Sequence, residues 1–307
     1  MKELVVISGK GGTGKTSIVG SFAALADGKV LADCDVDAAD LHLILNPEIR
    51  VREPFAGGKR ARIDAARCTA CGECLERCAF DAVFQDEAPD GQEGGAFCID
   101  PINCEGCGVC AHFCPEQAIE LDTCVNGEWY VSDTRFGPMV HARLGIAEEN
   151  SGKLVTLVRQ QARFVAVEKK LELIIVDGSP GIGCPVIASI TGADLVLAVT
   201  EPTQSGLHDL ERVHQLAEHF RIPLCVCVNK HDINPSVTAT IESTVTEWGA
   251  KVVGRVRYDA AVTKAQIHRS CVVEYVDGPV TQDVRELWDN VVCALAARPG
   301  ARCAKTP

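Results

Sequence analysis

A glycine-rich turn near the N-terminus carries the residue types that bind phosphate. The segment Gly9–Thr16 reads G-K-G-G-T-G-K-T and fits the pattern G-x-x-x-x-G-K-[ST]. Its glycines let successive backbone N–H groups curl around phosphate oxygens, and the helix expected after it points its positive end at the same anion. Lys15 is expected to reach the β- and γ-phosphates, and the Thr16 hydroxyl to bind Mg²⁺. The turn therefore predicts a site for a nucleoside triphosphate.

Two cysteine runs in the middle of the chain have the spacing of iron–sulfur ligands. Each run follows C-x₂-C-x₂-C-x₃-C, and the runs begin at Cys68 and Cys104. A cubane cluster needs four converging thiolates, and in two-cluster bacterial ferredoxins the fourth cysteine of each run binds the other cluster. This rule assigns one 4Fe–4S cluster to Cys68, Cys71, Cys74 and Cys114, and the other to Cys104, Cys107, Cys110 and Cys78.

The cysteine-rich segment also contains an internal repeat. Ile63-Asp64 precedes the first run, and Ile99-Asp100 precedes the second run 36 residues later. In the same way, Ala82-Val83 recurs as Ala118-Ile119. The eight cysteines thus belong to a duplicated unit. Zinc is the alternative metal, although four-cysteine zinc sites usually pair two CxxC units across a longer gap.

Composition limits the classes of protein to which the chain can belong. Of its 307 residues, 47% are hydrophobic and 23% are charged, which is typical of a globular protein with about two domains. The net charge, 30 minus 42, is −12, so we expect no nucleic-acid partner. No apolar run has the length of a membrane span, and the N-terminus does not read as a signal peptide. Seventeen cysteines then indicate metal or redox chemistry in a reducing compartment, and we expect a cytoplasmic protein.

Short segments rich in Val and Ile alternate with helical segments on both sides of the cysteine-rich part. Strands are expected at residues 3–8, 29–32, 171–176, 194–200, 223–228 and 251–256. Helices are expected at 16–27, 151–170, 184–191, 205–220, 236–249, 259–268 and 279–297. This alternation predicts an α/β fold with a doubly wound, mostly parallel sheet. It breaks off between about residues 48 and 150.

An additional lysine gives the phosphate-binding turn a resemblance to a known family. Lys10 resembles the signature lysine of the deviant Walker A motif in MinD/ParA-type ATPases and the nitrogenase iron protein. Asp33–Asp35 is similar to the switch I segment of that family, and Leu173–Gly181 to its Walker B strand and switch II. Three loops resemble its other nucleotide-flanking segments: Thr200–Thr203, Val228–Lys230 and Val256–Asp259.

The resemblance implies an ATPase that acts as a nucleotide-dependent dimer. Lys10 would reach the phosphates bound by the partner, and Asp35 would orient the attacking water. Mg²⁺ would be held by Thr16, Asp35 and Asp177, and Asn229 would hydrogen-bond the adenine. The implied catalytic residues are Lys10, Lys15 and Asp35. The implied ATP-binding residues are Gly9, Lys10, Gly11, Gly12, Thr13, Gly14, Lys15, Thr16, Ser17 and Asn229. No strong general base stands out, so we expect slow hydrolysis without a partner.

The motifs together predict a discontinuous P-loop domain with an insertion. The MinD-like ATPase domain comprises residues 1–47 and 122–297, an inserted small α+β ferredoxin-like domain comprises 58–121, and a tail comprises 298–307. One further cysteine could bind a cluster. Cys184 lies seven residues after Asp177, where the nitrogenase iron protein has a cluster ligand. That likeness is partial because the nitrogenase protein has no ferredoxin insertion.

Three functions are compatible with these motifs. The first is a dimer that couples ATP hydrolysis to electron transfer through the two clusters, with a redox or iron–sulfur protein as its partner. The second is a scaffold for iron–sulfur cluster assembly, although no CxxC pair occurs outside the two runs. The third is a MinD/ParA-type nucleotide switch in partner-complex assembly or cell division. The dimer could be a homodimer or a heterodimer with a paralogous ATPase.

Overall fold

The computed structural model describes residues 1–86, 96–145 and 151–297. The chain forms two compact units. The first comprises Met1–Glu53, Trp129–Arg143 and the chain from Ser151 onward. The second comprises Pro54–Glu128 and the segment that begins at Leu144. Residues 122–128, which the sequence assigned to the ATPase domain, therefore group with the second unit. The predicted tail, 298–307, lies outside the described residues.

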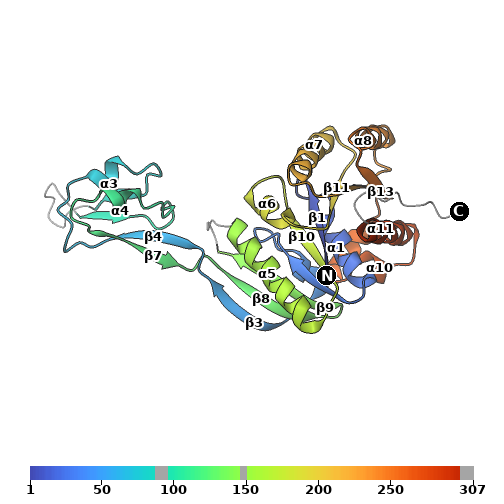
Figure 1. The fold of residues 1–307 in the computed structure, drawn as a ribbon, viewed down its shortest axis with the longest axis horizontal. Helices are drawn as coiled ribbons and strands as arrows, with labels where there is room; N and C mark the ends of the chain where they lie inside the picture. The colour runs from blue at the N-terminus through green and yellow to red at the C-terminus, as the bar shows by residue number, and fades with distance from the viewer. Residues whose placement is uncertain (87–95, 146–150, 298–307) are drawn as a thin grey trace. The chain divides into compact units, whose positions relative to one another are not determined.

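A nine-stranded sheet, mostly in the first unit, has the order β13-β12-β11-β1-β10-β2-β9-β8-β3 (Figure 1). Its strands are β1 (Lys2–Ser8), β2 (Lys29–Asp33), β3 (Glu48–Phe55), β8 (Gly127–Thr134), β9 (Gly137–Leu144), β10 (Leu173–Pro180), β11 (Leu195–Thr200), β12 (Leu224–Asn229) and β13 (Lys251–Val256). Every neighbouring pair from β13 to β9 is parallel. The predicted mostly parallel sheet is confirmed.

Helices cover both faces of this sheet. They are α1 (Lys15–Leu25), α2 (Leu41–Leu45), α5 (Ser151–Lys169), α6 (Cys184–Ile190), α7 (Gln204–His219), α8 (Pro235–Glu247), α9 (Ala260–Ile267), α10 (Val272–Tyr275) and α11 (Pro279–Ala296). Helices α5, α6 and α7 pack on one face, and α1 and α11 pack on the other (Figure 1). In the core, Leu4 and Val6 of β1 lie in one apolar cluster with Phe22 and Leu287. None of the described helices is both long enough and apolar enough to cross a membrane.

Strands β3, β8 and β9 extend the sheet beyond β2, in a part of the chain where no strand was predicted. Seven of the eight residues of β3 are exposed, so this strand lacks the apolar run of a buried strand. Strand β9 is largely buried and pairs with β2, with Met139 opposite Leu31. The extension therefore depends on the pairing of β9 with the edge of β2. Local sequence does not encode this pairing.

The turn between β8 and β9 is tied to two helices by Arg135. Its Nη1 donates to the carbonyl oxygens of Ile44 and Leu45 at 3.0 Å each, which satisfies the last carbonyls of α2. Its Nε and Nη2 donate to the Glu274 carboxylate of α10 at 3.0 and 2.8 Å. Burial alone would raise the pKa of Glu274, but the Arg135 guanidinium and the S–H and N–H of Cys271 lower it to about 2.

Exchange of Glu274 for Gln is expected to lower the free energy of unfolding at pH 7 by about 1 kcal/mol, since solvent screens this partly exposed pair. The lowered pKa means that the charged pair stabilises the fold above about pH 4.5 and that this contribution is lost as the pH falls towards 2. Urea unfolding of wild type and Glu274→Gln between pH 7 and pH 3 should therefore show a difference that shrinks with falling pH. A constant difference would contradict the ion-pair explanation.

The second unit contains two small antiparallel sheets. Strand β4 (Gly58–Ile63) pairs with β7 (Ile119–Cys124), and β5 (Val83–Gln85) pairs with β6 (Phe97–Ile99). Two short helices, α3 (Glu73–Glu76) and α4 (Val109–Phe113), lie within the two cysteine runs. Its small core comprises Ala61, Cys74, Val83, Phe97 and Ile119, with cysteines packed around it.

The two halves of the sequence repeat exchange strands. Strand β4 precedes the first cysteine run but pairs with β7, which follows the second run; β6 and β5 show the reverse arrangement. The contacts are equivalent: Asp64 N–H donates to the Ala118 carbonyl and Asp100 N–H to the Ala82 carbonyl, both at 2.7 Å. This pairing brings the end of each run beside the beginning of the other.

Candidate functional site

The phosphate-binding turn joins β1 to α1. Gly12 and Gly14 have φ values of 80° and 87°, in the left-handed region that favours glycine. Gly14 is also the N-cap residue of α1, so the positive end of this helix follows the turn directly. Gly9 serves packing as well, because a Cβ there would lie 2.3 Å from Cβ of Asp209 on α7. Thr16 is half-buried at the start of α1.

Three of the predicted catalytic and magnesium residues come together at the end of this turn. Lys15 Nζ lies 2.5 Å from Asp177 Oδ1 and 3.3 Å from Asp35 Oδ2, and all three residues are buried. The sheet explains the meeting, because β2 and β10 are neighbours with Asp33 opposite Asp177. The carboxyl ends of parallel strands thus deliver three aspartates to one lysine.

Three aspartates surround one lysine, so negative charge exceeds positive charge around Lys15. Burial alone would lower the pKa of Lys15, but the carboxylates of Asp177 and Asp35 outweigh it and raise the pKa. Burial, followed by the charge of Asp177, raises the pKa of Asp33 well above its usual range. Asp33 Oδ2 and Asp177 Oδ2 are buried and have no hydrogen-bond partner among the residues that the structure describes. Unpartnered carboxylate oxygens are ligands that Mg²⁺ prefers, so these residues fit the predicted ion.

A second charged group beside the turn was not predicted from the sequence. Glu201, just after β11, accepts from Lys230, and its Oε2 lies 3.6 Å from Lys10 Nζ. Lys10 is also within 3.4 Å of Ser205 Oγ. The sequence analysis compared the loop Thr200–Thr203 with a nucleotide-flanking segment of the family but predicted no role for Glu201. Its position at the carboxyl end of a predicted parallel strand was the available signal.

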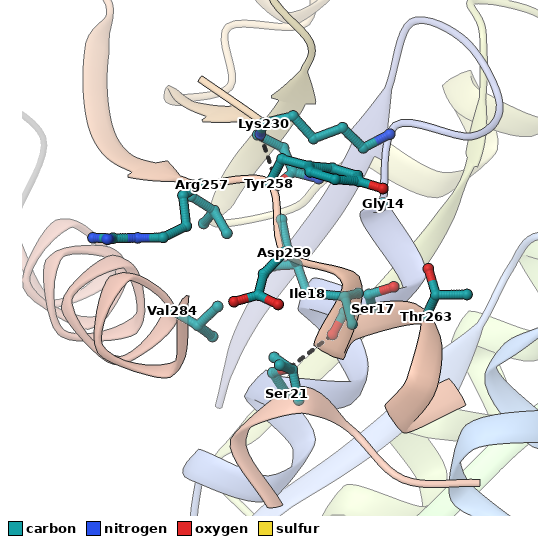
Figure 2. Close-up of a pocket in the computed structure, with 14 residues that line it drawn as sticks. Gly14, Ser17, Ile18, Ser21, Lys230, Arg257, Tyr258, Asp259, Thr263 and Val284 are labelled. Carbon is teal, nitrogen blue, oxygen red and sulfur yellow. Dashed lines mark hydrogen bonds between the residues drawn. The ribbon is translucent and has the colours of Figure 1, made fainter. Parts of the chain in front are cut away.

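An open pocket lies next to the turn and encloses about 500 Å³, a volume that includes its opening to solvent (Figure 2). Its lining residues are Gly14, Ser17, Ile18, Ser21, Asn229, Lys230, Val256, Arg257, Tyr258, Asp259, Val262, Thr263, Val272 and Val284. Two aspartates hold the predicted base-flanking loop, Val256–Asp259, in place. Arg257 donates to Asp283 at 2.6 and 2.8 Å, and Tyr258 N–H donates to Asp232 at 2.7 Å. The pocket has the apolar walls and polar edge suited to a nucleoside.

Eight cysteines of the second unit line two separate hollows. One, of about 330 Å³, is lined by Cys68, Cys71, Cys74 and Cys114. The other, of about 360 Å³, is lined by Cys78, Cys104, Cys107 and Cys110. Among the described residues, no group of three or more His, Cys, Asp or Glu is arranged to hold a metal ion. Cys184 is exposed at the start of α6 and lines neither hollow; its role as a ligand stays a prediction.

Two comparisons of sequence, with family models and with individual proteins, found relatives of the chain. A family model described as the CobQ/CobB/MinD/ParA nucleotide binding domain matches residues 4–272. The uncharacterized protein MJ0578 of Methanocaldococcus jannaschii is 31% identical over 298 residues, which cover 94% of this chain and 96% of that protein. A second uncharacterized protein of the same archaeon, MJ0579, is 26% identical over 249 residues, covering 76% and 83%.

Solved structures share the fold. The septum site-determining protein MinD of Pyrococcus horikoshii, complexed with Mg-ADP, has a TM-score of 0.57 at 12% identity, covering 96% of this chain and 97% of that chain. The MinC:MinD cell division protein complex of Aquifex aeolicus has a TM-score of 0.56 at 16% identity, covering 100% and 99%. At these identities the likeness concerns the fold alone.

Proposed function

Because the chain belongs to the CobQ/CobB/MinD/ParA nucleotide binding domain family, we propose that it is an ATP-hydrolysing nucleotide switch that carries two 4Fe–4S clusters. The buried Lys15, held between Asp35 and Asp177, carries the ATPase part of this proposal. Phosphoryl transfer to water needs positioning and charge neutralisation rather than covalent help. Lys15 would bind the β- and γ-phosphates, Asp35 would orient the water, and Thr16 and Asp177 would help to hold Mg²⁺. Bound Mg²⁺ would neutralise phosphate charge.

The contacts of Lys15 would differ between nucleotide-free and nucleotide-bound protein, as a switch requires. Phosphate oxygens would compete with Asp35 and Asp177 for its ammonium group. The segment after β2 is joined to the end of β10, because Cys34 N–H donates to the Asp177 carbonyl at 2.8 Å and Ser179 Oγ to the Cys34 carbonyl at 2.6 Å. When phosphate draws Lys15 away from the two carboxylates, both segments would therefore change together. This difference in contacts would separate the nucleotide-free from the nucleotide-bound protein.

The iron–sulfur part of the proposal rests on the exchanged strands of the second unit. Strand exchange gathers three cysteines of one run and the fourth of the other around each hollow. That division is the pattern of two-cluster ferredoxins. A zinc-binding unit is the alternative, and iron analysis distinguishes the two.

The solved structures with this fold favour the nucleotide switch, with a role in the assembly of partner complexes or in cell division. A second candidate, ATP-gated electron transfer to a redox or iron–sulfur partner, is favoured by the two cysteine-lined hollows. It is also favoured by the chain order, since the second unit begins 19 residues after Asp35, at Pro54. A cluster-assembly scaffold has less support because the chain has no further CxxC pair.

A dimer is part of this proposal. Lys10 would act across its interface on the phosphates of the other subunit. One archaeon encodes at least two relatives of this chain, MJ0578 and MJ0579, so a heterodimer of paralogues is as compatible as a homodimer.

Redox titration of the clusters tests the link between the two activities. The protein is purified without oxygen and followed by electron paramagnetic resonance with no nucleotide, Mg-ADP or a non-hydrolysable Mg-ATP analogue. Coupling predicts a potential shift on the order of 59 mV with the ATP analogue, equivalent to about 1.4 kcal/mol for one electron. The Lys15→Met variant is the control and should show no shift. Equal potentials in all three states would favour a switch in which the clusters are structural or sense redox state.

A further inference from the structure

Two consecutive residues at the end of β12, the last strand residue and the one after it, contact the phosphate-binding turn. Asn229 Nδ2 donates to the Thr13 carbonyl at 2.7 Å. Lys230 Nζ donates to the Gly12 carbonyl at 3.4 Å. Two neighbouring carbonyl groups of the turn are therefore held by side chains that lie more than 200 positions away in the sequence.

Holding these carbonyls fixes the direction of the next two N–H groups. The peptide bonds are trans, so each C=O points opposite to the N–H of the same peptide unit. The N–H groups of Thr13 and Gly14 must then point away from Asn229 and Lys230. In the part of the chain that the structure describes, neither N–H donates to another protein group. They are two aligned donors for phosphate oxygens.

The close approach of Asn229 depends on glycine at position 14. A Cβ on Gly14 would lie 2.4 Å from Asn229 Nδ2, closer than unbonded atoms approach. The side chain of Asn229 is also engaged at its oxygen, which accepts from Lys230 N–H at 3.0 Å. Asn229 is 8% exposed, and a buried amide with both ends bonded is held in one orientation.

Glu201 holds the side chain of Lys230 in place. Its carboxylate accepts from Lys230, whose backbone is in the left-handed region at φ 57°. Lys10 shares the same carboxylate at 3.6 Å. Glu201 therefore links Lys230 to the first lysine of the turn.

We propose that Asn229 and Lys230 are positioning residues for phosphate, with Glu201 as the anchor of Lys230. They hold the Gly12 and Thr13 carbonyls so that the following N–H groups are already aligned when nucleotide arrives. This rests on the proposed nucleotide function and differs from the role that the family resemblance implies for Asn229, which is to read adenine. A positioning role affects the binding of the phosphates and does not depend on which base the nucleotide carries.

Binding measurements with and without a base test the proposal. Asn229→Ala, Lys230→Met and wild type are titrated calorimetrically with Mg-ATP, Mg-GTP and magnesium tripolyphosphate. Loss of one hydrogen bond that holds the turn predicts about tenfold weaker binding of both ATP and tripolyphosphate by each variant, with the ratio of ATP to GTP affinity unchanged. Glu201→Gln should weaken both ligands in the same way, but less. Lys251→Met, an exposed lysine at the start of β13, is the matched control and should bind like wild type.

The outcomes separate this inference from the function on which it rests. Wild type that binds none of these ligands would overturn the proposed function, and the inference with it. Wild type that binds ATP, with variants that bind equally well or that change the ATP to GTP ratio, would overturn the inference alone. Thermal unfolding midpoints identify a variant that fails to fold. In that case the Glu201→Gln variant, at the edge of the site, is the test: weaker binding of ATP and tripolyphosphate supports the inference, and unchanged binding overturns it.

Discussion

The Lys15→Met variant is expected to hydrolyse ATP about a thousandfold more slowly than the wild type. Lys15 is a buried cation at the end of the phosphate-binding turn, and methionine keeps most of its length without its charge. The transferred phosphoryl group would then lack a fixed positive charge where negative charge develops. Release of inorganic phosphate under saturating Mg-ATP measures this effect.

The same exchange is expected to lower the free energy of unfolding by about 3 kcal/mol, because it leaves Asp35 and Asp177 as buried carboxylates without a partner. Urea unfolding without nucleotide measures this loss. Lys29→Met is the matched control, since Lys29 is also buried but lies at the opposite end of β2 and donates to the Ala26 carbonyl. It should hydrolyse ATP at close to the wild-type rate. A Lys15→Met enzyme of near wild-type activity would refute the assigned site.

The second large effect concerns the ligand sets of the clusters. Cys114→Ala is expected to reduce the iron content from about eight to about four atoms per chain, because one cluster loses a thiolate. Strand exchange places Cys114 with the first run, as a lining residue of the hollow that contains Cys68. The paramagnetic spectrum of reduced Cys114→Ala should therefore match that of Cys68→Ala and differ from that of Cys104→Ala. Iron analysis and electron paramagnetic resonance of protein prepared without oxygen check this.

A cysteine of the same unit provides the control for this experiment. Cys98 lines neither hollow and lies 3.9 Å from Asp86 Oδ2. Cys98→Ala should keep about eight irons and both signals. A Cys114→Ala spectrum that matched Cys104→Ala would show that each run binds its own cluster. Zinc in place of iron in the wild type would refute the iron–sulfur part of the function.

Local sequence was sufficient for the regular parts of the first unit. The apolar runs that become β1, β10 and β11 are buried on both faces, and such strands leave a continuous signal. Each of the five helices predicted after residue 180 begins within one residue of its observed start. The same information failed for β3, because an exposed edge strand has no apolar pattern to detect. The phosphate-binding turn was predictable because its chemistry is contained in eight consecutive residues.

Local sequence is enough to predict the phosphate-binding turn, the buried parallel strands and the two cysteine runs, because each depends on residues close together in the chain. Which distant groups meet depends on the folded structure. It placed Asp177 against Lys15, set Glu201 between Lys10 and Lys230, and turned Asn229 towards the Thr13 carbonyl. Those contacts follow from the order of strands in the sheet. That order is set by packing of whole faces against helices, a property that no local segment carries.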